Sequence, residues 1–408
     1  MSGVIIIGAG HAGSKTAQYL REYGYSKEII LFGEESVPPY ERPPLSKQIL
    51  HGSKEIIDCY LHDQEYYESK NILLYLNNKI CSVNFKKKEV FDKNNIKYNY
   101  DKLVFATGST PNKINSKNIN GIFYLRTQKD SLEIKDYVKD KNDIAIIGAG
   151  FIGLEIASFI RQKYNDKNIT IIDSYDKILR RNSNDLIRKK ITKLHQENKI
   201  KFIFNSEIIS VQGKNKIDEV ILQNNYNIKS DMMIVGIGVK PNTVLLEKEN
   251  IDISNGIKVD EYCQTSINDT YAVGDVSCYK SLVLKRFIRE ESWNNAEKQP
   301  RILAQNIIGN KIPYNEIPWF WTDQFGHNFQ ILGQIESFDK VITREYGDLK
   351  SISFFLENNK IVGAFSLNNS KDLRIAKEIM LKKIYIENSV LQNINFNLKQ
   401  IIKNNINE

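Results

Sequence analysis

Short apolar runs rich in β-branched residues recur along the chain, and each is followed by a glycine-rich or polar turn. Residues 3–8 read Gly-Val-Ile-Ile-Ile-Gly, a pattern typical of a buried parallel strand. A helix is predicted to follow as far as about Tyr23, because small and apolar residues recur on one side of it and Gly24 supplies a stop. A second strand is predicted over residues 28–32. The chain therefore opens with a strand–helix–strand unit.

The turn between the first strand and the helix has the spacing of a dinucleotide-binding fingerprint. Residues 8–13 read Gly-Ala-Gly-His-Ala-Gly. Gly8 permits the tight turn, Gly10 lets the backbone approach a pyrophosphate, and Gly13 lets helix and strand pack closely. The amino terminus of the helix adds free N–H groups for the phosphates. Glu34, 21 residues after Gly13 (34 minus 13), can accept hydrogen bonds from a ribose diol.

The same pattern recurs in the middle of the chain. Residues 143–147 form an apolar run, residues 148–153 read Gly-Ala-Gly-Phe-Ile-Gly, and a predicted helix follows. The next apolar run ends at Asp173, 20 residues after Gly153 (173 minus 153). Two complete fingerprints imply two bound dinucleotides. Electron transfer between a bound flavin and an exchangeable nicotinamide is the simplest use of such a pair.

Two acidic residues refine this prediction. The Asp173 carboxylate can accept from a free 2′-hydroxyl and would repel a 2′-phosphate, which predicts NADH over NADPH. Arg180 and Arg181 follow it and would weaken that preference. Residues 270–275 read Thr-Tyr-Ala-Val-Gly-Asp, a strand that ends in Gly-Asp. Asp275 is suited to bind the ribityl hydroxyls of a flavin, and a helix N-cap is an equally good interpretation of it.

Composition and charge narrow the classes of protein. The chain has 408 residues, 41% hydrophobic and 26% charged, as expected for a globular protein of two or three domains. No run approaches the ~20 apolar residues of a membrane span, and the first residues lack the pattern of a signal peptide, so we expect a cytoplasmic protein without a membrane partner. The net charge of +8 favours an acidic protein partner. Nucleic acid is not expected, because the basic residues are dispersed and no recognition motif accompanies them.

The four cysteines bear on the route of the electrons. Cys59, Cys81, Cys263 and Cys278 are widely scattered, and they form no CxxC pair and no spacing typical of metal ligands. No metal site is therefore expected. A flavin bound to this chain must pass its electrons on directly, because no pair of cysteines is spaced to relay them.

Further segments together resemble one family. Residues 39–47 read Pro-Tyr-Glu-Arg-Pro-Pro-Leu-Ser-Lys, residues 106–111 read Ala-Thr-Gly-Ser-Thr-Pro, and residues 318–324 read Pro-Trp-Phe-Trp-Thr-Asp-Gln. Residues 236–242 add Gly-Ile-Gly-Val-Lys-Pro-Asn. These segments are similar to those of the NADH-dependent ferredoxin and rubredoxin reductases that serve bacterial oxygenases, to which the apoptosis-inducing factors are related. The resemblance runs from residue 3 to about residue 383.

The resemblance implies an α/β protein with two Rossmann-like dinucleotide-binding domains, for FAD and NAD, and a C-terminal α+β domain. The pattern of the C-terminal part independently predicts a hairpin over residues 352–367, followed by a helix that Ser370 caps. The implied domains are the first part of the FAD-binding domain, 1–113, the NAD-binding domain, 114–238, the second part of the FAD-binding domain, 239–317, and the C-terminal domain, 318–408.

The resemblance also implies which residues hold the two dinucleotides. Glu34 would bind the adenosine ribose of FAD, Arg126 its diphosphate and Asp275 its ribityl chain. The tryptophans, Trp293 and Trp321 among them, would line the flavin or fill a hydrophobic core. The positions that match the FAD site are Gly8, Gly10, His11, Ala12, Gly13, Glu34, Arg42, Lys47, Ile80, Ala106, Thr107, Gly108, Arg126, Gly274, Asp275, Trp293 and Trp321. Those that match the NAD site are Gly148, Gly150, Phe151, Ile152, Gly153, Glu155, Asp173 and, near the nicotinamide, Gly238.

Lys47 and Glu155 form the pair with the clearest chemical role. The resemblance places both beside the isoalloxazine ring, where Lys47 would stabilise the negative charge that develops on reduction. Glu155 would balance the lysine and orient the nicotinamide. The alternative is that both are surface charges at the starts of helices.

The predicted function follows from these points. The chain would be an electron-transfer flavoprotein that takes hydride from NADH and passes electrons singly to an acidic [2Fe-2S] ferredoxin. The complex would be transient and electrostatic, and would dock on Lys285, Arg286 and Arg289. Two alternatives stay open: an NADH oxidase, dye or rubredoxin reductase, and an NADH-responsive binding protein like the apoptosis-inducing factor. The sequence leaves the choice between monomer and homodimer open.

Overall fold

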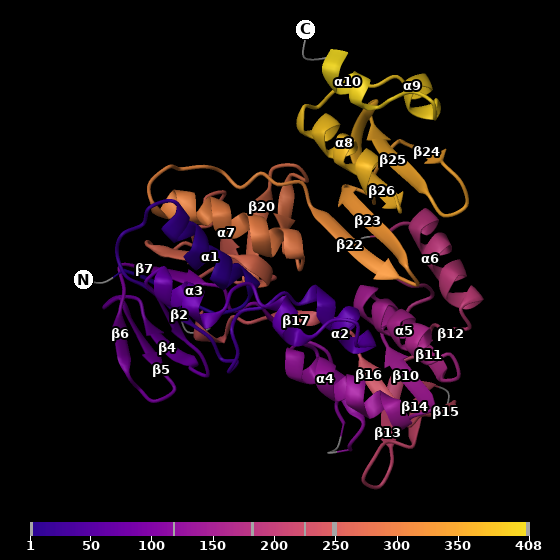
Figure 1. Ribbon diagram of the computed structural model, residues 1–408, viewed down its shortest axis with the longest axis horizontal. Coiled ribbons are helices and arrows are strands. Elements are labelled where there is room, and N and C mark those ends of the chain that lie inside the picture. The colour runs from indigo at the N-terminus through magenta and orange to yellow at the C-terminus, as the bar shows by residue number, and fades with distance from the viewer. Residues whose placement is uncertain (1–2, 117–118, 181–182, 224–225, 247–250, 405–408) are drawn as a thin grey trace. The chain divides into compact units, whose positions relative to one another are not determined.

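The computed structural model describes residues 3–116, 119–180, 183–223, 226–246 and 251–404 (Figure 1). Its contacts divide the chain into two compact units, each made of three segments. Unit 1 comprises Met1–Arg42, Ile56–Thr110 and Val239–Pro318, and unit 2 comprises Pro43–Glu55, Pro111–Gly238 and Trp319–Glu408.

Unit 1 is built on a parallel sheet in which β1 and β2 are fully buried and the edge strand β3 is partly exposed, in keeping with the apolar β-branched runs of the first two strands. The expected strand–helix–strand opening is confirmed, and the helix ends at Tyr23 and Gly24, the latter with a left-handed φ of 81°. Helices α1 (His11–Glu22) and α7 (Trp293–Ile307) pack side by side (Figure 1). In spatial order the strands are β19 (Thr270–Ala272), β7 (Lys102–Phe105), β1 (Val4–Ile7), β2 (Ile29–Phe32) and β3 (Ile72–Tyr75).

Smaller elements complete unit 1. An antiparallel sheet contains β4 (Ile80–Asn84), β5 (Glu89–Asp92) and β6 (Lys97–Asn99). A second small sheet contains β18 (Ile257–Val259), β20 (Ser277–Ser281) and β21 (Arg286–Ile288), and β8 (Ser109–Pro111) pairs with β17 (Val239–Pro241). The short helices are η2 (Ile56–Cys59), α3 (Gln64–Ser69), η5 (Val244–Leu246) and η6 (Gly274–Val276).

Unit 2 contains a second parallel sheet, which repeats the arrangement of the first. In spatial order its strands are β12 (Lys201–Ile203), β11 (Asn168–Ile172), β10 (Asp143–Ile147), β16 (Met232–Val235) and β9 (Ile122–Tyr124). A small antiparallel sheet is formed by β13 (Ile208–Gln212), β14 (Glu219–Leu222) and β15 (Asn227–Lys229). The helices are η1 (Pro43–Ser46), α2 (Gln48–His51), α4 (Gln128–Tyr137), η3 (Val138–Asp140), α5 (Phe151–Lys163) and α6 (Asp185–Glu197).

The C-terminal part of unit 2 is an antiparallel sheet that carries helix α8. The predicted hairpin is confirmed, and Asn358 and Asn359 form its turn with φ values of 50° and 56°. The predicted cap is wrong by one residue: the Asn369 side chain accepts from the Asp372 N–H, and Ser370 is the first helical residue. In spatial order the strands are β22 (Trp319–Gln324), β23 (His327–Gly333), β26 (Lys360–Leu367), β25 (Ser351–Glu357) and β24 (Lys340–Glu345). After β26 the chain continues with the helices α8 (Ser370–Leu381), α9 (Asn388–Gln392) and α10 (Lys399–Asn404).

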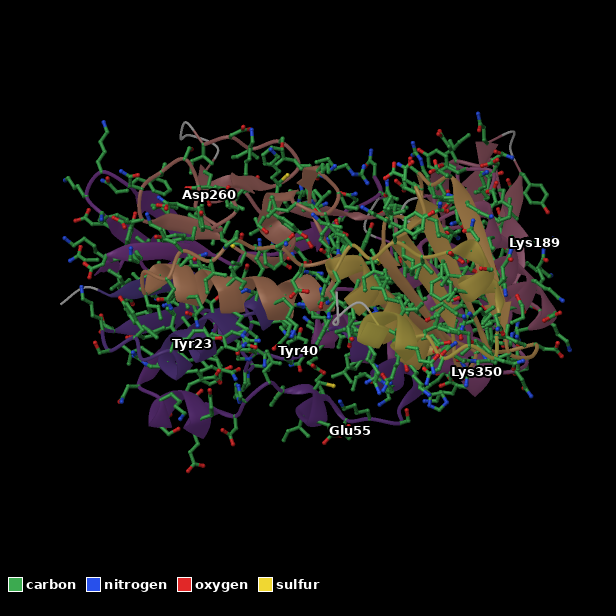
Figure 2. The ribbon with its side chains drawn as sticks, turned by 90° about the horizontal axis from the view of Figure 1, so that it is seen from above. Tyr23, Tyr40, Glu55, Lys189, Asp260 and Lys350 are labelled. Carbon is green, nitrogen blue, oxygen red and sulfur yellow. The ribbon has the colours of Figure 1, made fainter. Side chains whose placement is uncertain are left out.

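One segment of unit 2 departs from the domain limits expected from the sequence. Residues 43–55 were expected in the FAD-binding domain, but η1 and α2 pack against α4 and α5. Leu50 of α2 is buried in the hydrophobic core of unit 2, which explains the attachment. Many charged side chains lie on the surface, as the exposed Lys189, Asp260 and Lys350 illustrate (Figure 2).

Candidate functional site

The glycine turn of unit 1 has the shape of a phosphate cradle. Gly8 has a φ of 113°, and a Cβ atom there would lie 2.2 Å from the Ala106 carbonyl oxygen. A Cβ on Gly13 would lie 1.9 Å from the Gly8 oxygen, so neither position admits a larger residue. At Gly10, in contrast, a Cβ would meet nothing within 4 Å. The first turn of α1 has no acidic residue and no side-chain cap, so its N–H groups and this open space fit a pyrophosphate.

Unit 2 repeats this geometry. A Cβ on Gly148 would lie 2.3 Å from the Gly236 oxygen, a Cβ on Gly153 would lie 2.2 Å from the Gly148 oxygen, and one on Gly150 would meet nothing within 4 Å. Helix α5 likewise begins without an acidic residue or a side-chain cap. The second turn therefore fits a second pyrophosphate for the same physical reasons.

Asp173 stands at the end of β11, where the fingerprint requires an acid. Its Oδ2 accepts from the Ala149 N–H at 2.7 Å, and its Oδ1 accepts from the Tyr175 N–H at 3.0 Å. Burial raises the pKa of Asp173, and the hydrogen bond from Ala149 and the charge of Arg180 oppose that effect. The Arg180 guanidinium stacks on the Tyr175 ring at 3.7 Å. Arg181 lies outside the described residues.

Several predicted FAD positions of unit 1 are joined by polar contacts. His11 Nε2 lies 2.9 Å from Glu297 Oε2, and the Trp293 ring meets the His11 ring edge-on at 5.5 Å. Trp293 Nε1 donates to Glu41 at 3.0 Å. Asp275 lies inside the turn η6 and accepts from Ser109 Oγ at 2.9 Å. It does not cap that turn, whose N-cap is Val273, so the N-cap interpretation of Asp275 is wrong.

The remaining FAD positions of unit 1 differ in exposure. The Glu34 side chain is 70% exposed and pairs with Lys79 at 2.9 Å. Arg42 donates to Glu35 at 2.7 Å. The predicted positions Ala12, Ile80, Ala106 and Gly274 are buried, while Thr107 and Gly108 are partly exposed and bonded to Asn242.

Lys47 and Glu155 meet inside unit 2, and each is only 3% exposed. Lys47 Nζ lies 3.2 Å from Glu155 Oε1 and 2.9 Å from Asp323 Oδ2. Ser46 Oγ donates to Glu155 Oε2 at 2.5 Å, and Thr322 Oγ1 donates to Glu155 Oε1 at 2.6 Å. The two are therefore not surface charges, and the pair is a buried ionic cluster with donors on both carboxylate oxygens.

Burial and donors act on Glu155 in opposite directions. Burial raises the pKa of Glu155, and the charge of Lys47 with the hydrogen bonds from Ser46 and Thr322 works against that rise. Ser46, Thr322 and Asp323 had no role assigned from the sequence. They lie in the segments that carry the family resemblance, but only the folded chain shows that Ser46 and Thr322 converge on the Glu155 carboxylate and that Asp323 pairs with Lys47.

Aromatic rings surround this cluster within unit 2. Lys47 Nζ lies 5.4 Å from the centre of the Trp321 ring, which stacks on Trp319 at 5.1 Å. Phe151 of α5 contacts Phe320 at 4.3 Å. The predicted FAD positions Lys47, Arg126 and Trp321 belong to unit 2, and the other predicted FAD positions belong to unit 1.

Three further predicted positions of unit 2 are Ile152, Gly238 and Arg126. Ile152 is 46% exposed in the first turn of α5, and Gly238 is exposed with a φ of 91°. Arg126 immediately precedes the capping residue of α4, Thr127, and its backbone N–H donates to Asp130.

The expected docking patch is only partly exposed. Lys285 and Arg286 are exposed beside β21. The Arg289 side chain is 3% exposed, because it pairs with Glu291 and donates to Asn255 Oδ1 and the Asp275 carbonyl oxygen. Arg289 is therefore a structural residue, and its place in the predicted patch is wrong.

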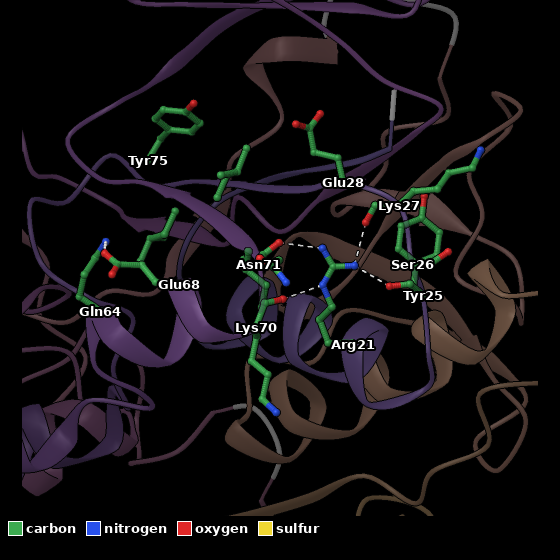
Figure 3. Close-up of a pocket in the computed structure, with 13 residues that line it drawn as sticks. Arg21, Tyr25, Ser26, Lys27, Glu28, Gln64, Glu68, Lys70, Asn71 and Tyr75 are labelled. Carbon is green, nitrogen blue, oxygen red and sulfur yellow. Dashed lines mark hydrogen bonds between the residues drawn. The ribbon is translucent and has the colours of Figure 1, made fainter. Parts of the chain in front are cut away.

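Unit 1 also has a surface cavity of about 830 Å³ beside β3 (Figure 3). The Arg21 guanidinium crosses it and donates to the carbonyl oxygens of Tyr25, Lys27, Lys70 and Asn71. None of the predicted dinucleotide residues lines this cavity. Because the Arg21 guanidinium already donates to four backbone carbonyl oxygens, it is not available to bind a phosphate. We therefore do not assign this cavity to a dinucleotide.

Three further findings concern chemistry outside the fingerprints. All four cysteines are free thiols, and only Cys81 is exposed. The described residues contain no cluster of histidine, cysteine and acidic side chains suited to a metal ion. Among the helices of the described residues, none has the length and apolar character needed to cross a membrane.

Comparisons with known proteins show the family to which the chain belongs. The model of the pyridine nucleotide-disulphide oxidoreductase family matches residues 2–299, and a reductase C-terminal model matches residues 319–402. The 3-phenylpropionate/cinnamic acid dioxygenase ferredoxin–NAD(+) reductase component of Photorhabdus laumondii is 32% identical over 388 residues, 95% of this chain and 98% of that protein. Rubredoxin–NAD(+) reductase of Pseudomonas putida is 31% identical over 342 residues, 83% of this chain and 88% of that protein.

A solved structure extends the likeness to the whole chain. The reductase in the covalent putidaredoxin reductase–putidaredoxin complex superposes with a TM-score of 0.94 at 28% identity. The match covers 100% of this chain and 99% of that one.

His195 of α6 gives a prediction about stability and pH. Burial lowers the pKa of His195 to about 4 from 6.5, and its hydrogen bond to Gln324 opposes part of that shift. The unfolded chain takes up this proton first, so the stabilising contribution is complete above pH 6.5 and is lost as the pH falls towards 4. The full shift corresponds to roughly 3 kcal/mol. Urea unfolding of wild type and His195→Phe should be measured at several pH values. Between pH 6.5 and 4, the free energy of unfolding should decrease less in the variant than in wild type. Equal pH dependence in both proteins would contradict the prediction.

Proposed function

The chain belongs to the pyridine nucleotide-disulphide oxidoreductase family, and on that basis we propose that it is an FAD-containing, NADH-dependent ferredoxin reductase. The observation that carries this proposal is the combination of two phosphate cradles with four cysteines that form no disulfide with one another. Two dinucleotides can bind, and no cysteine pair stands between the flavin and its acceptor. The likeness to reductase components of oxygenase systems points to a [2Fe-2S] ferredoxin as that acceptor.

The two units divide the work of binding. The amino termini of α1 and α5 hold the pyrophosphates of FAD and NADH. Glu34 binds the adenosine ribose of FAD, Asp275 its ribityl chain and Arg126 its diphosphate. Asp173 selects NADH over NADPH by accepting from the free 2′-hydroxyl. We expect the enzyme to act in the cytoplasm or inside an organelle. We expect it to be a monomer or a homodimer.

The buried cluster of unit 2 supplies the electrostatics. When bound, FAD supplies a ring that accepts hydride and releases electrons singly. Lys47 offers a positive charge that stabilises the negative charge gained on reduction. Glu155 balances Lys47 and orients the nicotinamide. The Trp321 ring, which stacks on Trp319, lies beside the Lys47 ammonium group and limits the access of water to it.

Removing the lysine charge tests this assignment. We expect Lys47→Met to slow the reduction of bound flavin by NADH by about tenfold or more, which is about 1.4 kcal/mol of barrier. Anaerobic stopped-flow absorbance at the flavin band measures the rate. Lys193→Met is the control for the loss of a lysine charge at the surface, since that lysine is 75% exposed and pairs with Glu197 on its own helix. An unchanged rate in Lys47→Met would refute the role of Lys47.

The identity of the acceptor is tested with the purified yellow protein. We expect NADH-dependent reduction of cytochrome c to depend strongly on an added [2Fe-2S] ferredoxin encoded in the same genome. Rapid consumption of NADH in air without ferredoxin would favour an oxidase. Slow reduction by NADH with a persistent charge-transfer band would favour an NADH-responsive binding protein like the apoptosis-inducing factor.

The turn that leads into β21 is the proposed docking site for the acidic ferredoxin. Lys285 and Arg286 are exposed, and Leu282 and Phe287 beside them are 45% and 46% exposed. A mixed basic and apolar surface suits a short-lived complex, in which charge speeds the encounter and apolar area adds contact. The net charge of +8 supports a partner of opposite sign.

Charge reversal tests this docking surface. We expect the double variant Lys285→Glu, Arg286→Glu to raise the KM for ferredoxin by about tenfold and to flatten its dependence on salt. Flavin reduction by NADH should not change, because neither residue belongs to the dinucleotide sites. Lys193→Glu on unit 2 is the control of similar exposure. A KM and salt dependence equal to those of wild type would rule out this surface.

A further inference from the structure

A buried chain of hydrogen bonds leads from helix α6 to the Glu155 carboxylate, entirely within unit 2. His195 Nε2 lies 2.8 Å from Gln324 Oε1, Gln324 Nε2 lies 3.0 Å from Thr322 Oγ1, and Thr322 Oγ1 lies 2.6 Å from Glu155 Oε1. His195 and Gln324 are 0% exposed, and Thr322 is 1% exposed. We call His195, Gln324 and Thr322 the donor chain.

Only one arrangement of protons satisfies the donor chain. The Gln324 amide nitrogen can only donate, so Thr322 Oγ1 accepts from it and the Thr322 proton is left for Glu155. Gln324 Oε1 can only accept, so His195 Nε2 must carry the ring proton. His195 Nδ1 is buried and has no hydrogen-bond partner, as suits the bare nitrogen of a neutral ring.

The flipped amide fails on the same criteria. If Gln324 Oε1 faced Thr322, the threonine proton would be shared between two acceptors. His195 Nε2 would then have to accept, and the ring proton would move to Nδ1, where no acceptor exists. Every proton of the chain therefore points towards Glu155.

The groups around the two ends explain why this direction matters. At the carboxylate end, Glu155 contacts the charged Lys47 and the Ser46 hydroxyl, and Lys47 also pairs with Asp323. At the other end, the His195 ring is packed against Phe202 and Phe325 at 6.0 and 4.9 Å. The apolar end keeps the ring neutral, while aligned donors strengthen one another and favour a charged acceptor.

We propose that the donor chain positions Glu155 and keeps it ionised, so that three residues outside the two glycine fingerprints set the lower pH limit of flavin reduction by NADH. His195, Gln324 and Thr322 are positioning residues, because only Glu155 meets the nicotinamide. The inference rests on the proposed function, in which Glu155 belongs to the NADH site.

The proton arrangement is tested first, without any activity. Spectra of the holoprotein labelled with ¹⁵N-histidine, assigned with His195→Phe, should show the Nε2–H tautomer of a neutral His195 ring between about pH 5 and pH 8. A proton on Nδ1, or a charged ring in that range, would overturn the proposal. This result stands even if the protein is not reduced by NADH, so it separates the proposal from the proposed function.

The pH profile of flavin reduction then tests the effect on Glu155. The rate of flavin reduction should fall on the acidic side of its pH profile, which we call the acidic limb. We expect His195→Phe and Gln324→Leu to shift the midpoint of this limb to a pH about one unit higher. His195→Gln should restore the wild-type limb, because its amide Nε2 is as many bonds from the backbone as the imidazole Nε2. Ser366→Ala is the control, since Ser366 is 0% exposed in β26 and its hydroxyl has no partner.

The variants distinguish positioning from mere structural support. If these residues were only structural, His195→Phe and Gln324→Leu would lower Tm and leave the acidic limb of the pH profile unchanged. His195→Gln would then not restore a wild-type pH profile. Folded His195→Phe and Gln324→Leu proteins with the wild-type limb would overturn the proposal. If a variant does not fold, the tautomer of the wild-type ring still decides it.

Discussion

Lys47 and Glu155 hold opposite charges 3.2 Å apart at positions where each residue is only 3% exposed. Charges taken out of water cost several kcal/mol each, and the cost is offset only when every oxygen and proton finds a partner. Here the partners come from three distant parts of the chain: the segment 43–55, helix α5 and strand β22. Together with the buried Leu50, these contacts join 43–55 and β22 to α5 within unit 2. The cluster around Lys47 and Glu155 therefore also joins three distant segments of the chain.

The two phosphate cradles impose a separate constraint. In each, a glycine whose Cβ would lie within 2.3 Å of a carbonyl oxygen shapes the turn, and a second glycine leaves open space at a helix amino terminus. Because this geometry occurs at both parallel sheets, the chain can bind two dinucleotides. The four cysteines form no disulfide with one another, which supports the proposed direct transfer from the flavin to its acceptor.

Local stereochemistry explains which features could be predicted from the sequence. The strands, the glycine turns and the hairpin at Asn358 and Asn359 follow from periodicity and from φ preferences, which a few neighbouring residues determine. The cap of α8 was misplaced by one residue, because Asn369 and Ser370 are adjacent and both have capping side chains. Arg289 was misjudged because its partner Asn255 lies 34 residues away in the sequence. No local pattern could show that Thr322 and Gln324 connect His195 to Glu155. The contacts of FAD and NADH with the predicted residues stay predictions.

The central claim is that electrons pass from NADH to the flavin and leave it without a cysteine relay. Anaerobic titration of the purified holoprotein with NADH, followed by flavin absorbance, tests it most directly. The account predicts complete reduction with one equivalent of NADH per FAD, since the flavin is the sole two-electron acceptor. A requirement for a second equivalent would reveal a redox-active disulfide and contradict the account.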